Sequence, residues 1–432
     1  MRFLLIGLFC FTFILNAADL QGPKTASSKR LDVTEKFDCI VVGAGISGFS
    51  ASVAAARAGA KVLLIDKMPS VGGTAVYAMP AMLSGWPKHH QAGGIADELA
   101  KLLLERKGLR WRINNAVYDE NIMQLVMLDM LRDAGVKTLF NALVTGVESE
   151  GRLIKRVIVQ FGTEKISCEA KNFVDATGNA SLSVLAGAEV ITPEVDKSMT
   201  KTLMFKVDNV KYFDSATADA KFDPIVRTRN FPVAIQDCFM GSILVRQDEA
   251  MLNLTAVIGD AADPVQYNAM YEELLQQIPQ ITAWLKKEIP EFKDMSVTKI
   301  APMLGVRYTR SIVSRRQLTM ADVHNPEPTE EVVALCGRYI GGHYINGFRS
   351  PWSSRVTGKM EIPYGAIRSR SFDNLLAAGS IIGVQPELIS AVRLNVTCIA
   401  SGQAAGIAAA LNIPPYEVLR KELLRQNCLL AR

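Results

Sequence analysis

Short apolar runs that end in glycine-rich turns mark the beginning of the folded part of the chain. Residues Phe37 to Val42 are rich in β-branched side chains, and they lead directly into a glycine turn at 43–48 and a small-residue stretch to Ala58. This order predicts a strand, a tight turn and a helix. A second apolar run, Lys61 to Ile65, predicts another strand, which ends at Asp66.

Later segments show both helical and strand periodicity. Apolar residues at three- and four-residue steps predict helices at 95–104 and 121–132, and apolar alternation between turn residues predicts an antiparallel β meander. The meander strands are expected at 143–147, 153–160 and 165–168, ahead of a separate strand that ends at Asp175. Strands at 242–246 and 252–257, and helices at 264–275, at 391–411 and from Tyr416 onward, complete the expected elements.

These patterns divide the chain into several parts. We expect a signal peptide at 1–17, a linker at 18–36, the first part of a nucleotide-binding domain at 37–190 and its return part at 356–411. Between them, 191–355 lacks glycine-turn patterns and is predicted to be an inserted α+β substrate domain. Residues 412–432 form a C-terminal helix in this scheme. The predicted fold class is therefore α/β with a parallel sheet and an insertion.

The first residues have the layout of a secretory signal peptide. Met1-Arg2 precedes an uncharged, mostly apolar run from Phe3 to Leu15, and small residues follow at Ala17-Ala18. The apolar run is short for a membrane span, so cleavage and export are the favoured interpretation. We expect no stable membrane span after cleavage. The expected location is periplasmic or extracellular, or the secretory lumen if the source is eukaryotic.

Charge and cysteine content narrow the classes of function. The 432 residues carry 48 basic and 43 acidic side chains, a formal net charge of +5, with no long basic run, which argues against a nucleic-acid partner. Six cysteines follow the signal peptide without a C-x-x-C pair or a ferredoxin-like run, so no metal or iron-sulfur site is expected. Cys39 and Cys398 lie in apolar segments and are expected to be small buried hydrophobes.

The first glycine turn has the spacing of a dinucleotide-binding motif. In Gly43-Ala44-Gly45-Ile46-Ser47-Gly48, the first glycine permits the turn, the second lets a pyrophosphate approach the backbone and the third allows close helix packing. Asp66 ends the next strand, where an acidic side chain is expected to hold ribose hydroxyls. The helix N-terminus presents unpaired N–H groups to the phosphates.

Three later turns favour FAD over NAD. A second glycine pair, Gly72-Gly73, follows Asp66 closely, and two further short strands end in turns at Asp175–Gly178 and Asn374–Gly379. A nicotinamide-binding domain does not need these additional turns, whereas a larger dinucleotide does.

With these motifs, the chain resembles the FAD-dependent oxidoreductase family that includes heterodisulfide reductase A-like proteins, within the glutathione-reductase-type flavoproteins. The resemblance extends from about Phe37 to Leu411 and is carried by the glycine turns, by Gly94-Ile95 with Glu98-Leu99, by 175–180 and by 393–411. It implies a Rossmann-type domain with non-covalently bound FAD. The resemblance also implies that the long C-terminal helix points its start at the flavin ring. The alternative for Gly402 and Gly406 is that they only allow helix–sheet packing, and both roles can hold together.

The residues predicted to bind FAD come from all of these turns and from the C-terminal helix. They are Gly43, Ala44, Gly45, Ile46, Ser47, Gly48, Asp66, Lys67, Gly72, Gly73, Thr74, Val144, Ala176, Thr177, Gly178, Gly379, Gly402, Gln403 and Ala404.

Four basic side chains are candidates for handling substrate charge and protons. Arg307 and Arg310 lie in a segment resembling a family pattern, although Tyr308 and Ser311 replace the glutamate and the further arginine of that pattern. His343 falls where relatives carry Asp-x-His, with glycine in place of the aspartate. Arg393 opens the C-terminal motif and is the fourth candidate. For each, the alternative is an ordinary surface or hydrogen-bonded role.

Several functions agree with this sequence. The leading one is an FAD-dependent oxidoreductase acting by hydride transfer on an unidentified small, anionic molecule. The alternatives are a flavin-dependent lyase or isomerase, and an FAD-binding scaffold or electron-transfer subunit with a protein redox partner. The adjacent His89 and His90 raise a metal site or a covalent flavin link as an alternative, but no further ligands have suitable spacing, so they are interpreted as a solvated loop.

Overall fold

The structure is a computed structural model with two units, Met1–Asp32 and Val33–Arg432. The described residues all belong to the second unit. The described residues are 35–84, 93–112, 115–195, 198–228, 230–233, 239–324, 329–336 and 360–430. The predicted signal peptide, His89, His90 and His343 lie outside these ranges.

A parallel sheet forms the centre of the nucleotide-binding part. Its strands, in spatial order, are β6 (Lys137–Leu139), β2 (Val62–Ile65), β1 (Phe37–Val42), β9 (Glu164–Asp175) and β18 (Leu375–Ala377). Every residue of β2 and all but one of β1 are buried, as expected for parallel strands covered on both faces. The fold is therefore α/β, as predicted.

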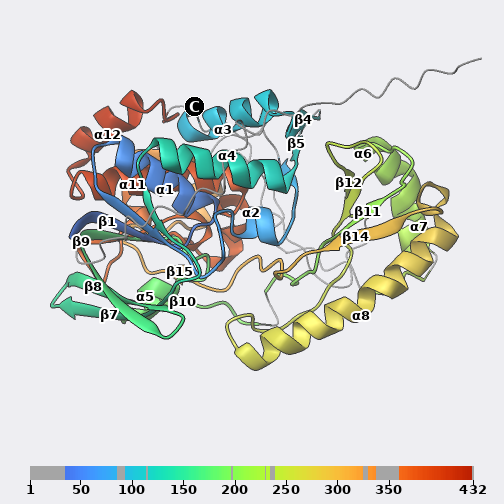
Figure 1. The fold of residues 1–432 in the computed structure, drawn as a ribbon, viewed down its shortest axis with the longest axis horizontal. Coiled ribbons are helices and arrows are strands. Elements are labelled where there is room, and N and C mark those ends of the chain that lie inside the picture. Colours follow the sequence, from blue (N-terminus) through green and yellow to red (C-terminus); the bar gives the residue numbers. More distant parts are fainter. Residues whose placement is uncertain are drawn as a thin grey trace, which may run out of the picture. The chain divides into compact units, whose positions relative to one another are not determined.

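The β meander is built on the first half of β9. Strands β7 (Leu143–Glu150) and β8 (Leu153–Phe161) pair in antiparallel fashion, and β8 pairs with 164–169 of β9. The prediction of a short meander strand separate from the strand that ends at Asp175 is wrong, because β9 runs unbroken through both. Its second half joins the parallel sheet, so one strand connects both layers (Figure 1).

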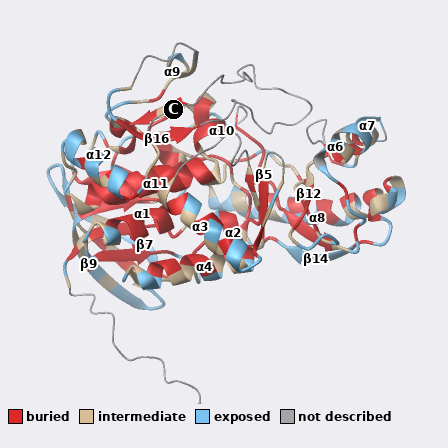
Figure 2. Ribbon diagram, turned by 90° about the horizontal axis from the view of Figure 1, so that it is seen from above, coloured by how far each residue is buried: buried red, intermediate tan, exposed pale blue. Residues whose placement is uncertain are grey.

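Helices cover the side of the parallel sheet that faces away from the β meander (Figure 1). They are α1 (Ile46–Arg57), α3 (Gly94–Glu105), α4 (Glu120–Asp133), α11 (Asn395–Ala410) and α12 (Tyr416–Arg425). The interiors of α1 and α11 are buried almost throughout, whereas α12 has an exposed face (Figure 2). The predicted helix at 391–411 is divided, because α10 (Ile389–Val392) ends before Arg393 and α11 begins at Asn395.

A second sheet and a long helix organise the described residues between 198 and 306. The strands pair in the order β12 (Gly241–Ile243), β13 (Ala250–Leu252), β11 (Phe205–Asp208) and β14 (Ser296–Ile300), all antiparallel, and α8 (Pro264–Glu288) packs with them in one hydrophobic core. The strand predicted at 252–257 was placed too late, since β13 ends at Leu252. Four phenylalanine rings, Phe213, Phe222, Phe239 and Phe292, pack edge-on or tilted inside this core.

A buried ion pair joins the nucleotide-binding part to the second part, which is the second sheet with α8. Glu120, 1% exposed at the start of α4, accepts hydrogen bonds from Lys206 of β11 at 2.5 Å and from Lys299 of β14 at 3.1 Å. Burial raises the pKa of the Glu120 carboxyl, but the hydrogen bond and charge of Lys206, supported by Lys299, outweigh burial and lower the pKa overall.

The remaining short elements connect these parts. They are α2 (Thr74–Tyr77), β3 (Met82–Ser84), β4 (Leu109–Trp111), β5 (Asn115–Tyr118), α5 (Ser181–Leu185), β10 (Val190–Ile191), α6 (Ser215–Thr217), α7 (Asp223–Thr228), β15 (Ser311–Ile312), α9 (Ala321–His324), β16 (Val332–Cys336) and β17 (Met360–Pro363). No helix among the described residues is both long enough and apolar enough to cross a membrane.

Candidate dinucleotide and substrate site

The glycine turn between β1 and α1 has the geometry that the sequence predicts. Gly43 has a φ of +102°, and a Cβ built there would lie 2.4 Å from the Ala176 carbonyl oxygen. A Cβ on Gly48 would lie 1.7 Å from the Gly43 carbonyl oxygen. These two glycines are therefore required by the fold itself, for the turn and for the close approach of α1 to it.

Gly45 differs from its two neighbours in the turn. It is the N-cap residue of α1 with a φ of −64°, and the nearest heavy atom to a Cβ built there is the Gly73 Cα, 4.0 Å away. Neither its backbone conformation nor its packing requires a glycine. A ligand that approaches the helix N-terminus would require it, because the first N–H groups of a helix have no intrahelical acceptors.

The second glycine pair lies against the first turn. Gly45 and Gly72 form an isolated parallel bridge, and the Gly72 N–H donates to the Ala44 carbonyl oxygen at 2.8 Å. Gly73 has a φ of +49°, and a Cβ there would lie 2.7 Å from the Gly45 Cα. The structure thus brings together two turns that are more than 20 residues apart in the chain.

Asp66 is placed at the end of β2 beside the same turn. Its carboxylate accepts hydrogen bonds from the backbone N–H groups of Ala44 and of Met68, the latter at 2.7 Å. Burial raises the pKa of Asp66, and these two N–H donors oppose that rise. A carboxylate has about four acceptor positions, so Asp66 retains capacity for ribose hydroxyls.

Other predicted cofactor residues surround this carboxylate. Backbone hydrogen bonds tie Asn141 to Met68 and Ala142 to Asp66, which brings the start of β7, with the buried Val144, close to the acid. Lys67 is exposed next to it, and its charge acts to lower the pKa of Asp66.

The turn after β9 is held by a buried carboxylate. Asp175 is fully buried and accepts hydrogen bonds from the N–H and hydroxyl groups of both Thr177 and Ser183. Burial raises the pKa of Asp175, against these four donors. The Ala176 N–H donates to the Val42 carbonyl oxygen, which places this turn at the end of the sheet where the glycine turn lies. Gly178 is exposed there.

α11 packs directly on α1 rather than on the sheet alone. A Cβ on Gly402 would lie 2.3 Å from the Ser47 carbonyl oxygen, and one on Gly406 would lie 2.0 Å from that of Ala51. The two helices run in the same direction, because the step from Gly402 to Gly406 on α11 matches the step from Ser47 to Ala51 on α1. Gly379, with φ of +79°, also approaches Ser47 closely. Gly402 and Gly406 therefore allow α11 to pack closely on another helix, α1, whereas the sequence suggested close packing of a helix on the sheet.

This pairing has a consequence for the start of α11. α11 has seven residues before Gly402, whereas α1 has only Ile46 before Ser47. About one turn or more of α11 therefore projects beyond the start of α1, on the side of the glycine turn. In that projecting turn the fully buried hydroxyl of Thr397 has no hydrogen-bond partner among the described residues.

Gln403 has a role that the sequence did not indicate. Its side-chain oxygen accepts from the Ile95 N–H at 3.1 Å, and its side-chain nitrogen donates to the Gln426 carbonyl oxygen at 3.1 Å. This side chain therefore connects α11 with the start of α3 and the end of α12. Its place in the cofactor site, like that of Gly402 and Ala404, stays a prediction.

Two of the predicted substrate-site arginines lie near each other. Arg307 is 9% exposed, and its guanidinium donates to the Thr200 carbonyl and hydroxyl oxygens and to Asn253 Oδ1. Burial lowers the pKa of Arg307 to about 9, with a contribution from the charge of Arg393, the residue that precedes the N-cap of α11. Arg393, at the start of α11, is thus close enough to Arg307 for its charge to act on the guanidinium.

Of the other two candidates, Arg310 lies within the described ranges and His343 does not. Arg310 is half-buried, and it makes no hydrogen bond or ion pair within the described part of the chain. Tyr308 and Ser311, which replace the glutamate and the further arginine of the family pattern, form an uncharged hydrogen-bonded pair. Their hydroxyl oxygens lie 3.1 Å apart. Burial raises the pKa of Tyr308 to about 12.

Lys201 joins Arg307 and was missed in the sequence. It is 2% exposed, it donates to the Ser198 hydroxyl at 2.7 Å, and the charge of Arg307 acts on it. A lysine among Thr200 and Thr202 looks like a solvent-facing position, and only the pairing of this segment with Val257 and Gly305 buries it.

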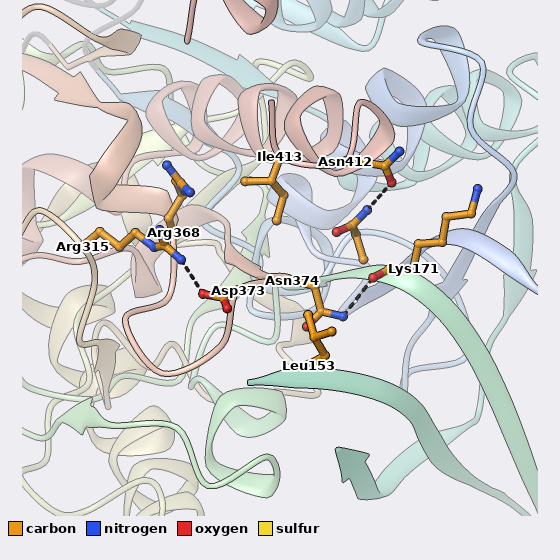
Figure 3. A pocket seen from close by; sticks show the side chains of 9 residues that line it. Leu153, Lys171, Arg315, Arg368, Asp373, Asn374, Asn412 and Ile413 are labelled. Atoms are coloured by element: carbon orange, nitrogen blue, oxygen red, sulfur yellow. Dashed lines mark hydrogen bonds and ion pairs between the residues drawn. The ribbon is translucent and has the colours of Figure 1, made fainter. Parts of the chain in front are cut away.

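A hollow of about 440 Å³ lies elsewhere, at the amino end of β18. The glycine turns lie at the carboxyl ends of the parallel strands, so this hollow is not the dinucleotide site. Several of its polar side chains bond to one another or to the backbone, as the Arg315–Asp373, Asn172–Asn412 and Asn374–Lys171 contacts show (Figure 3). The full lining is Leu153, Lys171, Asn172, Arg315, Arg368, Asp373, Asn374, Asn412 and Ile413.

Among the described cysteines, Cys39, Cys168, Cys398 and Cys428 are free thiols, and Cys336 is buried. Cys39 and Cys398 are buried, as predicted, and burial raises the pKa of each to about 12. Within the ranges that the structure describes, no group of three or more His, Cys, Asp or Glu side chains is arranged to hold a metal ion.

Comparison with known proteins agrees with this geometry. The model of a family described as FAD dependent oxidoreductase matches residues 38–419. Fumarate reductase (cytochrome) from Shewanella frigidimarina is 45% identical over 63 residues, which are 15% of this chain and 11% of that protein. Urocanate reductase from Eggerthella lenta is 31% identical over 100 residues, 21% of this chain and 16% of that protein. The matches therefore span a small part of these relatives.

Among solved structures, a geranylgeranyl bacteriochlorophyll reductase-like protein from Thermoplasma acidophilum is similar. The TM-score is 0.47 with 14% sequence identity, over 90% of this chain and 83% of the other.

Proposed function

Because this chain belongs to the family of FAD-dependent oxidoreductases, we propose that it binds FAD without a covalent link and exchanges a hydride with a small, anionic molecule. The narrower relationship to heterodisulfide reductase A-like proteins is part of this proposal, resting on the motifs at 94–99 and 393–411.

The observation that carries the proposal is the open position at Gly45. Every other glycine of the first turn is required by a protein contact, whereas a Cβ at Gly45 would meet nothing closer than 4.0 Å. The N-terminus of α1, the carboxylate of Asp66 and the Gly72-Gly73 pair converge around it. A pyrophosphate bound at the helix N-terminus with its ribose at Asp66 accounts for this arrangement.

FAD, when bound, supplies the acceptor or donor of the hydride. The chain's own residues position it and the substrate. The projecting N-terminal turn of α11 provides a partial positive charge and the Thr397 hydroxyl, which has no partner within the described ranges. Arg307 and Arg393 supply positive charge on the same side and favour a negatively charged substrate there.

Export of the mature protein is a further part of the proposal. Its support is the charged start, the uninterrupted apolar run and the small residues at Ala17-Ala18.

The experiment that tests the redox function is a spectroscopic screen of the FAD-loaded protein. Candidate small anions and their uncharged amides are mixed anaerobically with the oxidised and with the reduced protein, and the flavin absorbance is followed. We expect bleaching or recovery with a subset of the anions. Turnover without net oxidation or reduction would favour the lyase or isomerase, and inertness toward small molecules with reaction toward a protein partner would favour the electron-transfer subunit.

The Arg307→Ala variant provides the residue-level test. We expect its FAD content to equal that of the parent while substrate-dependent bleaching slows by about tenfold or more, because a charge-assisted hydrogen bond is lost. Arg246→Ala, at an exposed arginine of the second part, is the matched control and should leave both unchanged. Loss of FAD in the Arg307 variant would contradict a substrate role for this residue.

A further inference from the structure

Two buried cations, Lys201 and Arg307, have no ion-pair partner among the described residues. The side chains of Lys201 and Arg307 are almost fully covered, at 2% and 9% exposure. Neither forms an ion pair within the described part of the chain. By contrast, the other well-buried lysine, Lys206, has Glu120 at 2.5 Å. Buried charges in proteins are normally paired, so two cations without an ion-pair partner among the described residues require an explanation.

The contacts of Lys201 leave most of its hydrogen-bonding capacity unused. An ammonium group has three donors, and in the described residues only the Ser198 hydroxyl, at 2.7 Å, accepts from it. Asp260 acts on it electrostatically without reaching ion-pair distance. Burial, partly offset by Asp260 and reinforced by Arg307, lowers the pKa of Lys201 to about 8.

Arg307 is fixed in place by neutral oxygen atoms. One terminal nitrogen donates to the carbonyl and hydroxyl oxygens of Thr200, and the other lies 3.4 Å from Asn253 Oδ1. Thr200 immediately precedes Lys201, and Thr202 forms a bridge with Gly305, two residues before Arg307. The pairing of these two segments therefore brings the guanidinium of Arg307 to Thr200, the residue next to Lys201.

We propose that Lys201 and Arg307 together form the subsite that holds the negatively charged group of the substrate. An anion between them supplies a counter-charge and accepts from donors that have no other acceptor in the described part of the chain. Arg393 connects this subsite to the start of α11, because its charge acts on Arg307. The group is a carboxylate or a phosphate, and calling its carrier a substrate rests on the proposed function.

The proposal predicts an unusual stability effect. A lysine that stabilises the fold lowers stability when it is replaced, whereas a buried cation kept for a ligand destabilises the ligand-free protein. Lys201→Met retains the length and covers the same apolar surroundings without the charge. In anion-free buffer we therefore expect this variant to melt at the same temperature as the parent or above it.

The test measures anion binding to the FAD-loaded protein by titration calorimetry at pH 7. Inorganic phosphate and acetate are titrated in separate arms at constant ionic strength, which distinguishes the two anion types. We expect the parent to bind at least one of them, and Lys201→Met to weaken that binding by about tenfold or more. Lys201→Arg should retain most of it. Lys211→Met, at an exposed lysine of the same part, is the control and should bind as the parent does.

Three results would overturn the proposal: no binding of either anion by the parent, unchanged binding in Lys201→Met, or a Lys201→Met protein that fails to fold or melts several degrees lower. FAD content is measured in the same samples. A parent that lacks FAD contradicts the proposed function, whereas an FAD-loaded parent that binds neither anion contradicts only the subsite.

Discussion

Alanine substitutions at Gly45 and Gly48 should separate a glycine required by a ligand from one required by the fold. A Cβ at Gly48 would lie 1.7 Å from the Gly43 carbonyl oxygen, so α1 or the turn has to move. Overpacking of this kind costs about 1–3 kcal/mol of the free energy of unfolding. At Gly45 the nearest atom is 4.0 Å away and φ is −64°, which alanine adopts freely. Its cost should stay within about 1 kcal/mol, since only a weak N-cap preference is lost.

The assay combines urea unfolding of the FAD-free proteins with measurement of FAD affinity. We expect Gly48→Ala to unfold at clearly lower urea concentration than the parent, and Gly45→Ala to unfold close to it. FAD binding should nevertheless weaken strongly in Gly45→Ala, because the added methyl group fills the space that the pyrophosphate needs. Full FAD occupancy in Gly45→Ala and in the larger Gly45→Val would refute the assignment of this turn.

Three further predictions concern charge and location. Glu120→Gln should lower the free energy of unfolding by about 3 kcal/mol or more, because it leaves Lys206 buried without its charged partner. Since folding lowers the pKa of Glu120, the stability that its carboxylate contributes is present above the unfolded-state pKa and is lost as pH falls through the folded-state pKa. Unfolding curves over a pH series in which the parent loses no more stability than Glu120→Gln would contradict this prediction. The affinity for phosphate or acetate should fall as pH rises through about 8, because Lys201, whose pKa is set by burial and by the charges of Asp260 and Arg307, loses its proton there. Calorimetry that shows no such fall in the parent would exclude a charged Lys201 from the subsite. Fractionation with N-terminal sequencing should find an exported protein beginning near residue 18, while a cytosolic protein that retains Met1 would overturn the signal-peptide interpretation.

The nucleotide-binding turn was predictable because its residues are local in the chain. The positive φ of Gly43 and the close contact of Gly48 follow directly from a strand, a turn and a helix in succession. The length of β9 was not predictable from alternation, because its polar middle, 169–172, is retained in the sheet by pairing first with β8 and then with β1. The break before α11 falls at Arg393 and Leu394, without a proline or glycine that would mark it in the sequence.

The substrate side was the less predictable part of the site. Arg307 was identified by its resemblance to a family pattern, but its burial on Thr200 depends on contacts between segments more than 100 residues apart. Lys201 gave no signal at all, since an isolated lysine between threonines has the pattern of a surface position. Its burial arises from two isolated backbone bridges, one between Lys201 and Val257 and one between Thr202 and Gly305.

The most direct test of this account is the flavin content of the mature protein. The protein is purified without added cofactor and denatured, and the released nucleotide is identified by chromatography and counted against protein concentration. The account predicts a yellow protein that releases one FAD per chain on denaturation, leaving none covalently attached. A colourless protein that does not take up FAD on reconstitution, or one that releases tightly bound NAD instead, would contradict it.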